Sequence, residues 1–334
     1  MDFVKVALVG AGGMGSVHST VYSGISDVKV TAVADVCRDR AEKAAYAHGA
    51  AVYASIDELL EKERPDLVDL CTPTYLHSGM AVKALTGKAH VLCEKPMALN
   101  TEDGEKMLKA ARENGRYLMV GQVIRFWPEY VYLKQIYDKG TYGKLNQILF
   151  SRIGQRPKWS WENWMMYMEK SGRAPLDLHI HDTDFILHML GKPKAVYSSI
   201  AEKDNTISYI LTQYVYDTIV AVAEGAWYDQ AFPFSMTFRA AFDRAILEFR
   251  DNKLAVYPEE GEPRTVSAND IEKAAATGIN ISSVGAYENE IRYFIRCIRN
   301  GVPPETASPE STVECLNIAL KEVESARTGK IVYI

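Results

Sequence analysis

The stretch from Leu176 to Gly191, LDLHIHDTDFILHMLG, gathers side chains that can move protons or bind metals. Three of the seven histidines and three aspartates lie within it. Histidine is the residue whose ordinary pKa lies nearest to neutral pH, and it is also the most common metal ligand. Three interpretations are open at this point: a metal site, a site of proton transfer, or the polar start of a helix.

Helical geometry separates these interpretations. If residues 176–191 form a helix, Asp177 and His181 lie four residues apart and on one face. His179 and His181 then point about 200 degrees apart and cannot share an ion, so we expect no metal here. His179 either contacts a substrate or is an ordinary helix residue, and we expect Asp184 and His188 to be partners in the core.

Between Val4 and Gly121, short apolar runs alternate with helical patterns. Continuous Val, Leu and Ala runs separated by helices are typical of a parallel sheet covered on both faces. Ser55 and Glu58 have the spacing of a capping box, and Gly87 and Gly115 stand where helices should end. We expect strands within 4–10, 28–35, 66–71, 89–94 and 116–121, and helices from near Met14 and within 38–49, 76–87 and 101–115.

A glycine motif, GAGGMG, follows the first of these strands. Gly10 permits a tight turn, Gly12 lets the backbone approach a pyrophosphate, and Gly15 allows close packing of helix on strand. Asp35, 20 residues after Gly15, would accept hydrogen bonds from ribose hydroxyls and repel a 2′-phosphate. The motif therefore predicts a dinucleotide site that takes NAD, with NADP less favoured. Arg38 either softens this discrimination or lies on the helix surface.

Two later strand ends also carry polar residues, and ligands of open α/β sheets bind outside the carboxyl ends of strands. Thr72 and Pro73 make a rigid turn, after which Thr74 or His77 could contact cofactor. Lys95 lies between a buried strand and a proline, and it is either a catalytic lysine or a solvated loop residue. The expected cofactor-binding residues are Gly10, Gly12, Gly13, Met14, Gly15, Asp35, Arg38, Thr72, Pro73, His77, Glu94 and Lys95.

After Gly121 the pattern changes to long alternating strands, within 206–228 and 234–258. We expect an α/β protein in which residues 1–123 form a Rossmann NAD-binding domain. Residues 124–334 are expected to form an α+β domain for substrate binding and oligomerisation, with an open, mostly antiparallel sheet. Trp159, Trp161 and Trp164 could stack on sugar rings or belong to the core. Trp164 is the preferred contact because it lies nearest to Asp177 in sequence.

Several motifs occur in one order along nearly the whole chain: GAGGMG with Asp35, CTPTYLH, CEKPMALN, VGQVIRFWPEY, SGRAPLDLHIHDTDFILHMLG and AYENEIRYFIRCIRNGVPPETASPE. Together they resemble the glucose-fructose oxidoreductase, inositol dehydrogenase and rhizopine catabolism family (Gfo/Idh/MocA). In that family the lysine of E-K-P and the aspartate and histidine of D-x-x-x-H line one pocket beside the nicotinamide. The resemblance assigns these positions to Lys95, Asp177 and His181.

The resemblance implies an NAD-dependent oxidoreductase acting on a secondary hydroxyl or ketone of a sugar, cyclitol or related polyhydroxy compound. His181 would be the general acid/base, because an imidazole suits the transfer of a hydroxyl proton. Lys95 would stabilise charge on the substrate oxygen, and Asp177 would orient the substrate or tune the pair. The expected substrate-binding residues are Lys95, Arg125, Trp164, Asp177, His181 and Tyr287, the last either in the pocket or in the core.

Two alternatives remain beside this function. Some relatives retain NAD and cleave glycosides by oxidation and elimination, and regulatory relatives sense sugar and nucleotide without turnover. The complete Lys95, Asp177 and His181 set disfavours a sensor. One departure is visible, because residues 171–175 replace the usual glycines and Arg173 could reach the substrate mouth. The resemblance also implies a homodimer or homotetramer.

Composition limits the other classes of function. The chain has 334 residues, enough for two domains, and 47% of them are hydrophobic. A net charge of −5 gives no basic surface for nucleic acid or an anionic membrane. No apolar run is long enough to span a bilayer, so a cytoplasmic location is expected. The five cysteines are expected to be reduced and mostly buried.

Overall fold

The computed structural model describes residues 3–203, 206–267 and 285–334. The chain divides into two compact units, residues 1–123 with 282–314 and residues 124–281 with 315–334. The sequence-based boundary at 123/124 coincides with one division between the units. Residues 285–314, however, pack with the first unit, whereas the division expected from the sequence assigns them to the second domain. Within the described part of the chain, no helix has the length and apolar character needed to cross a membrane.

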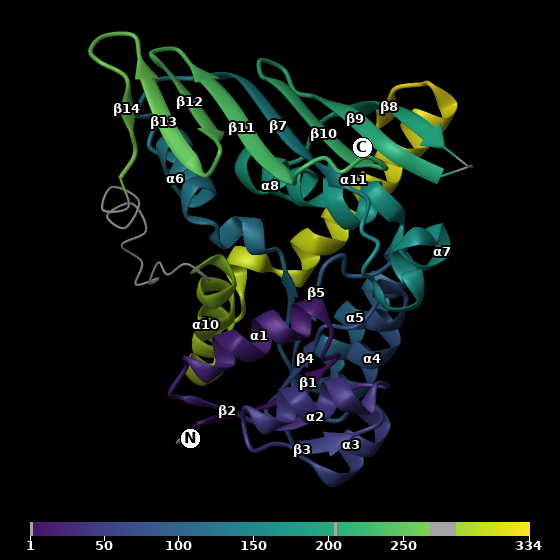
Figure 1. The fold of residues 1–334 in the computed structure, drawn as a ribbon. Coiled ribbons are helices and arrows are strands. Elements are labelled where there is room, and N and C mark those ends of the chain that lie inside the picture. The colour runs from purple at the N-terminus through teal and green to yellow at the C-terminus, as the bar shows by residue number, and fades with distance from the viewer. Residues whose placement is uncertain (1–2, 204–205, 268–284) are drawn as a thin grey trace. The chain divides into compact units, whose positions relative to one another are not determined.

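The first unit contains a six-stranded parallel sheet in the order β3-β2-β1-β4-β5-β6 (Figure 1). This order reverses direction between β1 and β4, as in other doubly wound dinucleotide-binding folds. The expected Rossmann fold is confirmed. The strands are β1 (Val4–Val9), β2 (Val28–Ala34), β3 (Ala51–Tyr53), β4 (Leu67–Leu70), β5 (His90–Glu94) and β6 (Leu118–Gly121).

Helices follow these strands along the chain, and the helix ends expected at Ser55, Gly87 and Gly115 are confirmed. Helix α4 begins at Thr74, two residues before the expected range, and strand β3 was not among the expected strands. The Ser55 hydroxyl accepts a hydrogen bond from the Glu58 amide at 3.2 Å. Gly115 adopts a left-handed conformation, with φ of 60°, at the end of α5. The helices are α1 (Gly13–Ser23), α2 (Arg38–Tyr46), α3 (Ile56–Lys62), α4 (Thr74–Thr86), α5 (Thr101–Asn114), α10 (Gly285–Asn300), the 3₁₀ turn η4 (Glu305–Ala307) and the first part of α11 (Pro309–Thr328).

The second unit contains a nine-stranded sheet in the order β14-β13-β12-β11-β7-β10-β9-β8-β15. Only the central pair, β7 and β10, is parallel among the paired strands described, so the expected mostly antiparallel sheet is confirmed. The strands are β7 (Leu145–Gln155), β8 (Ala195–Lys203), β9 (Thr206–Val215), β10 (Val220–Tyr228), β11 (Ser235–Phe242), β12 (Ala245–Arg250), β13 (Lys253–Pro258), β14 (Arg264–Thr265) and β15 (Val332–Tyr333).

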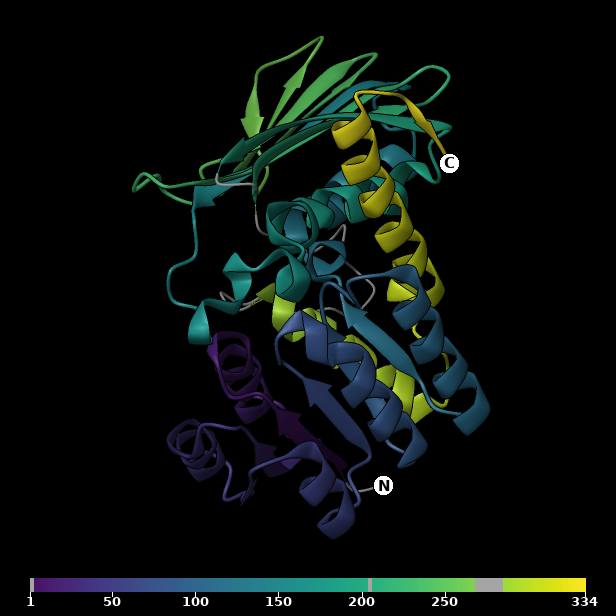
Figure 2. The same ribbon diagram turned by 90° about the vertical axis from the view of Figure 1, so that its right-hand side faces the viewer.

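Helices of the second unit pack on one face of this sheet, which Figure 2 shows almost edge-on; in that view no helix of the described chain covers the other face. An aromatic cluster fills the packed face: the Tyr130 ring meets Phe185 edge-on with 5.0 Å between ring centroids. Such pairs add about 0.5–1.5 kcal/mol to the burial of their area. The helical elements are η1 (Val123–Phe126), α6 (Pro128–Asp138), η2 (Trp161–Met166), α7 (Met168–Ser171), η3 (Ala174–His179), α8 (Ile180–Leu190) and the end of α11.

Candidate active site

The glycine turn between β1 and α1 has the geometry that the sequence predicts. Gly10 has φ of +91°, and a Cβ on it would lie 2.6 Å from the Cys71 carbonyl oxygen. A Cβ on Gly15 would lie 1.9 Å from the Gly10 carbonyl oxygen, so neither position tolerates a side chain. A Cβ on Gly12 meets nothing within 4 Å. Gly12 precedes the first residue of α1, and no side chain caps the amides at the start of this helix. The open space at Gly12 therefore adjoins backbone amides that can bind an anion.

Asp35 holds this turn in place. Its carboxylate accepts hydrogen bonds from the amides of Ala11 and Cys37, each at 2.7 Å. A carboxylate can accept about four hydrogen bonds, so capacity remains for ribose hydroxyls. Arg38 is exposed and pairs with Glu42 at 2.7 Å on its own helix. This contact is the one expected of a surface arginine, and the cofactor role of Arg38 stays a prediction.

Two buried polar groups at the carboxyl ends of strands have no hydrogen-bond partner. The Thr72 hydroxyl, after β4, is one of them, and the Gln122 amide, after β6, is the other. A buried polar group without a partner costs about 1–3 kcal/mol, so a ligand that bonds to these two groups would remove that cost. Together with the open space at Gly12, they fit a dinucleotide lying across this edge of the sheet. Gln122 was not among the residues that the sequence analysis selected.

His77 connects two of the strand-end loops. Its ring nitrogens lie 2.8 Å from the carbonyl oxygens of Thr72 and Pro96. Burial lowers the pKa of His77, although the two carbonyl contacts act in the opposite direction. His77 thus positions Thr72 and the loop that carries Lys95, while a direct cofactor contact by His77 remains a prediction.

Glu94, the first residue of the E-K-P motif, is anchored by a buried histidine. Its Oε1 lies 3.1 Å from His18 Nε2, and its Oε2 accepts the Lys95 amide at 3.1 Å. Burial tends to raise the pKa of Glu94, but His18 brings it below its ordinary value. The ring of Tyr287 lies 6.1 Å from the His18 ring. The backbone of Lys95 is therefore tied to a polar cluster within the first unit.

In the second unit, Asp177 and His181 lie on a helix that begins irregularly. Residues Ala174–His179 form a π-helix, and regular α-helix begins only at Ile180. The four-residue spacing of Asp177 and His181 was interpreted for a regular α-helix, and the π-helix departs from that geometry at Asp177. Asp177 is 9% exposed, and His181 is partly exposed. π-Helical segments such as this π-turn at Ala174–His179 are rare in proteins, and a large share of them lie at functional sites.

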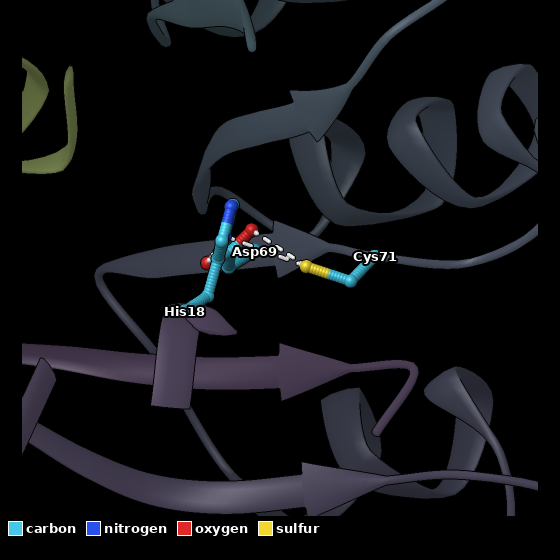
Figure 3. Close-up of side chains that lie close together, drawn as sticks. All are labelled: His18, Asp69 and Cys71. Atoms are coloured by element: carbon cyan, nitrogen blue, oxygen red, sulfur yellow. Dashed lines mark hydrogen bonds and ion pairs between the residues drawn. The ribbon is translucent and has the colours of Figure 1, made fainter. Parts of the chain in front are cut away.

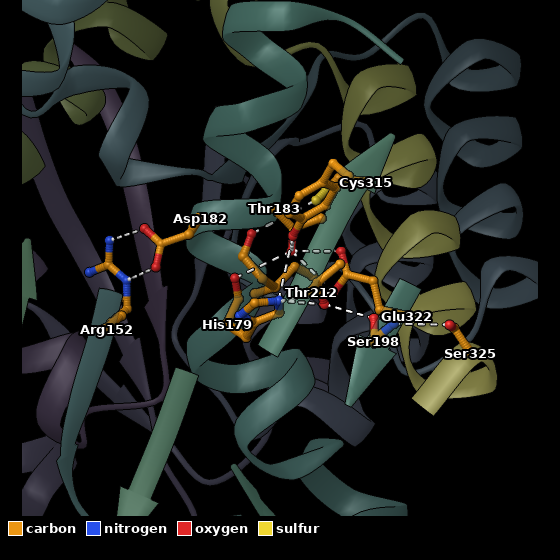
Figure 4. Close-up of polar contacts among 11 residues, drawn as sticks. Arg152, His179, Asp182, Thr183, Ser198, Thr212, Cys315, Glu322 and Ser325 are labelled. Carbon is orange, nitrogen blue, oxygen red and sulfur yellow. Dashed lines mark hydrogen bonds and ion pairs between the residues drawn. The ribbon is translucent and has the colours of Figure 1, made fainter. Parts of the chain in front are cut away.

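His179 anchors the π-turn instead of facing a substrate. Its ring is fully buried, with Nε2 3.2 Å from both Glu322 Oε2 and Thr212 Oγ1 (Figure 4). The Thr183 hydroxyl lies 3.1 Å from the same Glu322 carboxylate. A Cβ on Gly225 would lie 2.9 Å from the His179 Cβ, so the ring needs a glycine on β10. Of the two open interpretations, the structure supports a helix residue.

Just before the π-turn, Arg173 is buried and hydrogen-bonded within its own segment. Arg173 is 2% exposed, and its guanidinium donates to the Met166 carbonyl. Its backbone has φ of 56°, an uncommon conformation for a non-glycine residue. Trp164 packs against a small cluster that includes Ala174 and Leu178. Trp164 therefore lies next to the π-turn that carries Asp177, while its contact with substrate stays a prediction.

Two bidentate ion pairs fix α8 and its surroundings. Arg125 donates to Asp184 at 2.8 and 2.6 Å, and Arg152 donates to Asp182 at 3.1 and 2.8 Å. All four side chains are nearly fully buried. Asp184 is thus the core partner expected for it, whereas the role of Arg152 carried no local signal in the sequence. The substrate contact of Arg125 stays a prediction.

The fold and the glycine turn define a dinucleotide-binding protein with a second α+β unit, and comparison with known proteins agrees. Residues 4–122 match the family described as "Oxidoreductase family, NAD-binding Rossmann fold", and residues 130–262 match the "GFO/IDH/MocA C-terminal domain". Inositol 2-dehydrogenase of Rhizobium meliloti (strain 1021) is 30% identical over 313 residues, 89% of each chain. The chain belongs to the Gfo/Idh/MocA oxidoreductase family.

Two further similarities are informative. The 2,7-anhydro-N-acetylneuraminate hydratase of Escherichia coli (strain K12) is 31% identical over 189 residues, 57% of this chain and 50% of that protein. The structure of levoglucosan dehydrogenase in complex with NADH and levoglucosan has a TM-score of 0.88 and 19% identity, and the match covers 99% of each chain. The second similarity supports the fold alone. The family therefore includes proteins named both as dehydrogenases and as a hydratase.

Proposed function

We propose that this protein transfers hydride between NAD and a secondary hydroxyl or ketone of a sugar, cyclitol or related polyhydroxy compound. The observation that carries the proposal is the similarity to inositol 2-dehydrogenase over 89% of both chains. The glycine turn, whose geometry suits a pyrophosphate, adds independent support.

The cofactor would be held by residues of the first unit. Gly12 and the start of α1 would meet the pyrophosphate, and the Asp35 carboxylate would accept the ribose hydroxyls. A 2′-phosphate placed near Asp35 would meet its negative charge, which favours NAD over NADP. Bound NAD would supply the hydride acceptor. The remaining expected contacts are Gly10, Gly13, Met14, Gly15, Arg38, Thr72, Pro73, His77, Glu94 and Lys95.

The acid/base work is assigned by the family resemblance to Lys95, Asp177 and His181. His181 would take the hydroxyl proton as the carbon is oxidised, because an imidazole can accept it at neutral pH. Lys95 would donate a hydrogen bond to the same oxygen and stabilise its negative charge, a contribution of several kcal/mol in a preorganised site. Asp177 would orient the substrate. Arg125, Trp164 and Tyr287 complete the proposed substrate contacts.

The first experiment measures NADH formation by the purified protein with NAD, and in parallel NADPH formation with NADP. The substrates are inositols, aldoses, amino sugars and simple glycosides. A signal with NAD and one compound class supports the proposal. Silence with every compound, from protein shown to bind NAD, would refute it.

The role of His181 is tested by substitution. We expect His181→Ala to lower kcat by two or more orders of magnitude, the usual contribution of a positioned acid/base, while NAD affinity is retained. His188→Gln, on the same helix, is the matched control and should keep turnover near the wild-type value. Equal turnover in His181→Ala and wild type would remove His181 from the mechanism.

A second candidate is glycoside cleavage by oxidation and elimination with retained NAD. It is favoured by the relative named as a hydratase. Substrate consumption without release of NADH would identify this reaction. A sensor without turnover is disfavoured because the sequence contains all three residues of the proposed catalytic set, Lys95, Asp177 and His181. A homodimer or homotetramer and a cytoplasmic location stay predictions from the resemblance and the sequence.

A further inference from the structure

Beneath the glycine turn, three side chains with metal-binding atoms converge. His18 comes from α1, Asp69 from β4, and Cys71 directly follows β4 (Figure 3). His18 Nδ1 lies 2.8 Å from Asp69 Oδ2 and 3.4 Å from Cys71 Sγ, and the sulfur lies 3.6 Å from Asp69 Oδ1. In the described part of the chain this is the one group of at least three such residues whose ligand atoms all lie within 4.8 Å of one another.

These spacings are close to those of a tetrahedral zinc site. Zinc bonds of 2.0–2.3 Å at tetrahedral angles place neighbouring ligand atoms about 3.3–3.6 Å apart. The two distances that involve Cys71 Sγ, 3.4 and 3.6 Å, already match. The sulfur distance to the carboxylate is measured to Asp69 Oδ1, which would be the ligand atom. The 2.8 Å contact joins His18 Nδ1 to the other oxygen, Oδ2, and this hydrogen bond must break before Nδ1 can bind a metal ion.

The groups around the cluster are those that orient metal ligands in known sites. A histidine that binds metal through one nitrogen usually donates its other N–H to a carboxylate. Here His18 Nε2 faces Glu94 Oε1 at 3.1 Å, on the side of the ring away from Cys71. The carboxylate of Asp69 is itself held by the Tyr22 hydroxyl, which donates to Oδ2 at 2.8 Å. His18 and Asp69 are fully buried, and Cys71 is partly exposed.

The charges also balance. A divalent cation bound to one thiolate, one carboxylate and one neutral imidazole has no net charge, and the neighbouring Glu94 carboxylate can accept a hydrogen bond from His18 Nε2. Cation binding displaces the thiol proton of Cys71 and requires His18 Nδ1 to carry no proton, with the ring proton on Nε2 facing Glu94. A sulfur ligand selects zinc or a similar soft cation over magnesium or calcium. Three protein ligands leave a fourth position for water.

We propose that His18, Asp69 and Cys71 bind a thiophilic divalent cation, for which zinc is the best fit. None of the three ligands is among the residues proposed to handle the substrate, although the proposed substrate contact Tyr287 has its ring 6.1 Å from that of His18. Metal binding does not depend on the proposed oxidoreductase reaction. The site joins α1 to the end of β4 directly under Gly10 and Gly15.

The test uses Co²⁺ as a spectroscopic probe on the full chain freed of metal by chelation, without nucleotide. We expect a sulfur-to-cobalt charge-transfer band in the near ultraviolet and the visible bands of four-coordinate cobalt, both abolished by added Zn²⁺. Cys71→Ser should lose the charge-transfer band. Cys37→Ser, which removes another partly exposed thiol, should keep it. Absence of the band in the wild type, or its persistence in Cys71→Ser, would overturn the proposal.

A further variant guards against loss of fold in Cys71→Ser. Glu94→Gln keeps all three ligands and changes only the group that His18 Nε2 faces. We expect cobalt and zinc affinity to fall about 10- to 100-fold, as for other residues that orient ligands. Unchanged affinity in a folded Glu94→Gln protein would contradict the assigned geometry.

Discussion

The buried ion pair between Arg152 and Asp182 supports a quantitative test of the packing around α8. The side chains are 3% and 0% exposed, and Arg152 Nη2 lies 2.8 Å from Asp182 Oδ1. Burial alone would lower the pKa of Arg152, but Asp182 holds it above its ordinary value. In Asp182→Asn the guanidinium loses its counter-charge inside the protein. We expect the free energy of unfolding to fall by about 3–5 kcal/mol.

The chain offers a control with the same distance and different burial. Lys134 Nζ lies 2.8 Å from Asp138 Oδ2, but these side chains are 23% and 49% exposed. Water solvates the lysine when its partner is removed, so Asp138→Asn should cost at most about 1 kcal/mol. Replacing both members of the buried pair, as in Arg152→Met with Asp182→Leu, should recover most of the stability.

Urea unfolding followed by tryptophan fluorescence measures these costs. All five tryptophans lie within residues 124–281, so the signal reports on the second unit, which contains both ion pairs. A loss below about 1 kcal/mol for Asp182→Asn, or equal losses for the buried and exposed pairs, would refute the argument from burial.

Two other predictions concern single residues. The partly buried His90 ring accepts a hydrogen bond from the Tyr117 amide at 2.9 Å, and its partial burial lowers its pKa from 6.5 to about 4. As the pH falls, His90 takes up a proton in the unfolded chain before it does so in the folded protein. The free energy of unfolding should therefore decrease as the pH falls from 6.5 towards 4. His90→Asn should flatten the pH dependence of the urea midpoint, and an unchanged slope would contradict this. Gly225→Ala should cost about 1–3 kcal/mol because its Cβ would meet His179. Gly79 lies in an open position of α4, so Gly79→Ala should stabilise the protein by about 0.5–1 kcal/mol. Thermal unfolding should therefore show a lower melting temperature for Gly225→Ala and a higher one for Gly79→Ala, and a shift of both in the same direction would refute the steric account.

Much of the first unit follows from the sequence because its signals are local. Apolar runs, the GAGGMG turn and helix ends at Ser55 and Gly115 depend on residues a few positions apart. The steric need for Gly10 and Gly15 is confirmed by the atoms that a side chain would meet. The alternation within the later strands likewise indicates the antiparallel sheet of the second unit.

Other features depend on residues far apart in the chain, and no local pattern could show them. The position of helix α10 in the first unit depends on packing across more than half of the sequence. Gln122 lies in the VGQVIRFWPEY motif, but nothing in that motif singles it out, and only its burial without a partner marks it as a candidate ligand contact.

The sequence by itself determined the cofactor turn, the class of fold and the residues that resemble a catalytic set. Tertiary structure decided how those residues are supported, because charge pairing and burial are properties of assembled elements. Glu322 contacts the ring of His179, and Gly225 leaves room for that side chain, so both support the π-turn before α8. His18 and Asp69, 51 positions apart, meet only when α1 packs on the parallel sheet.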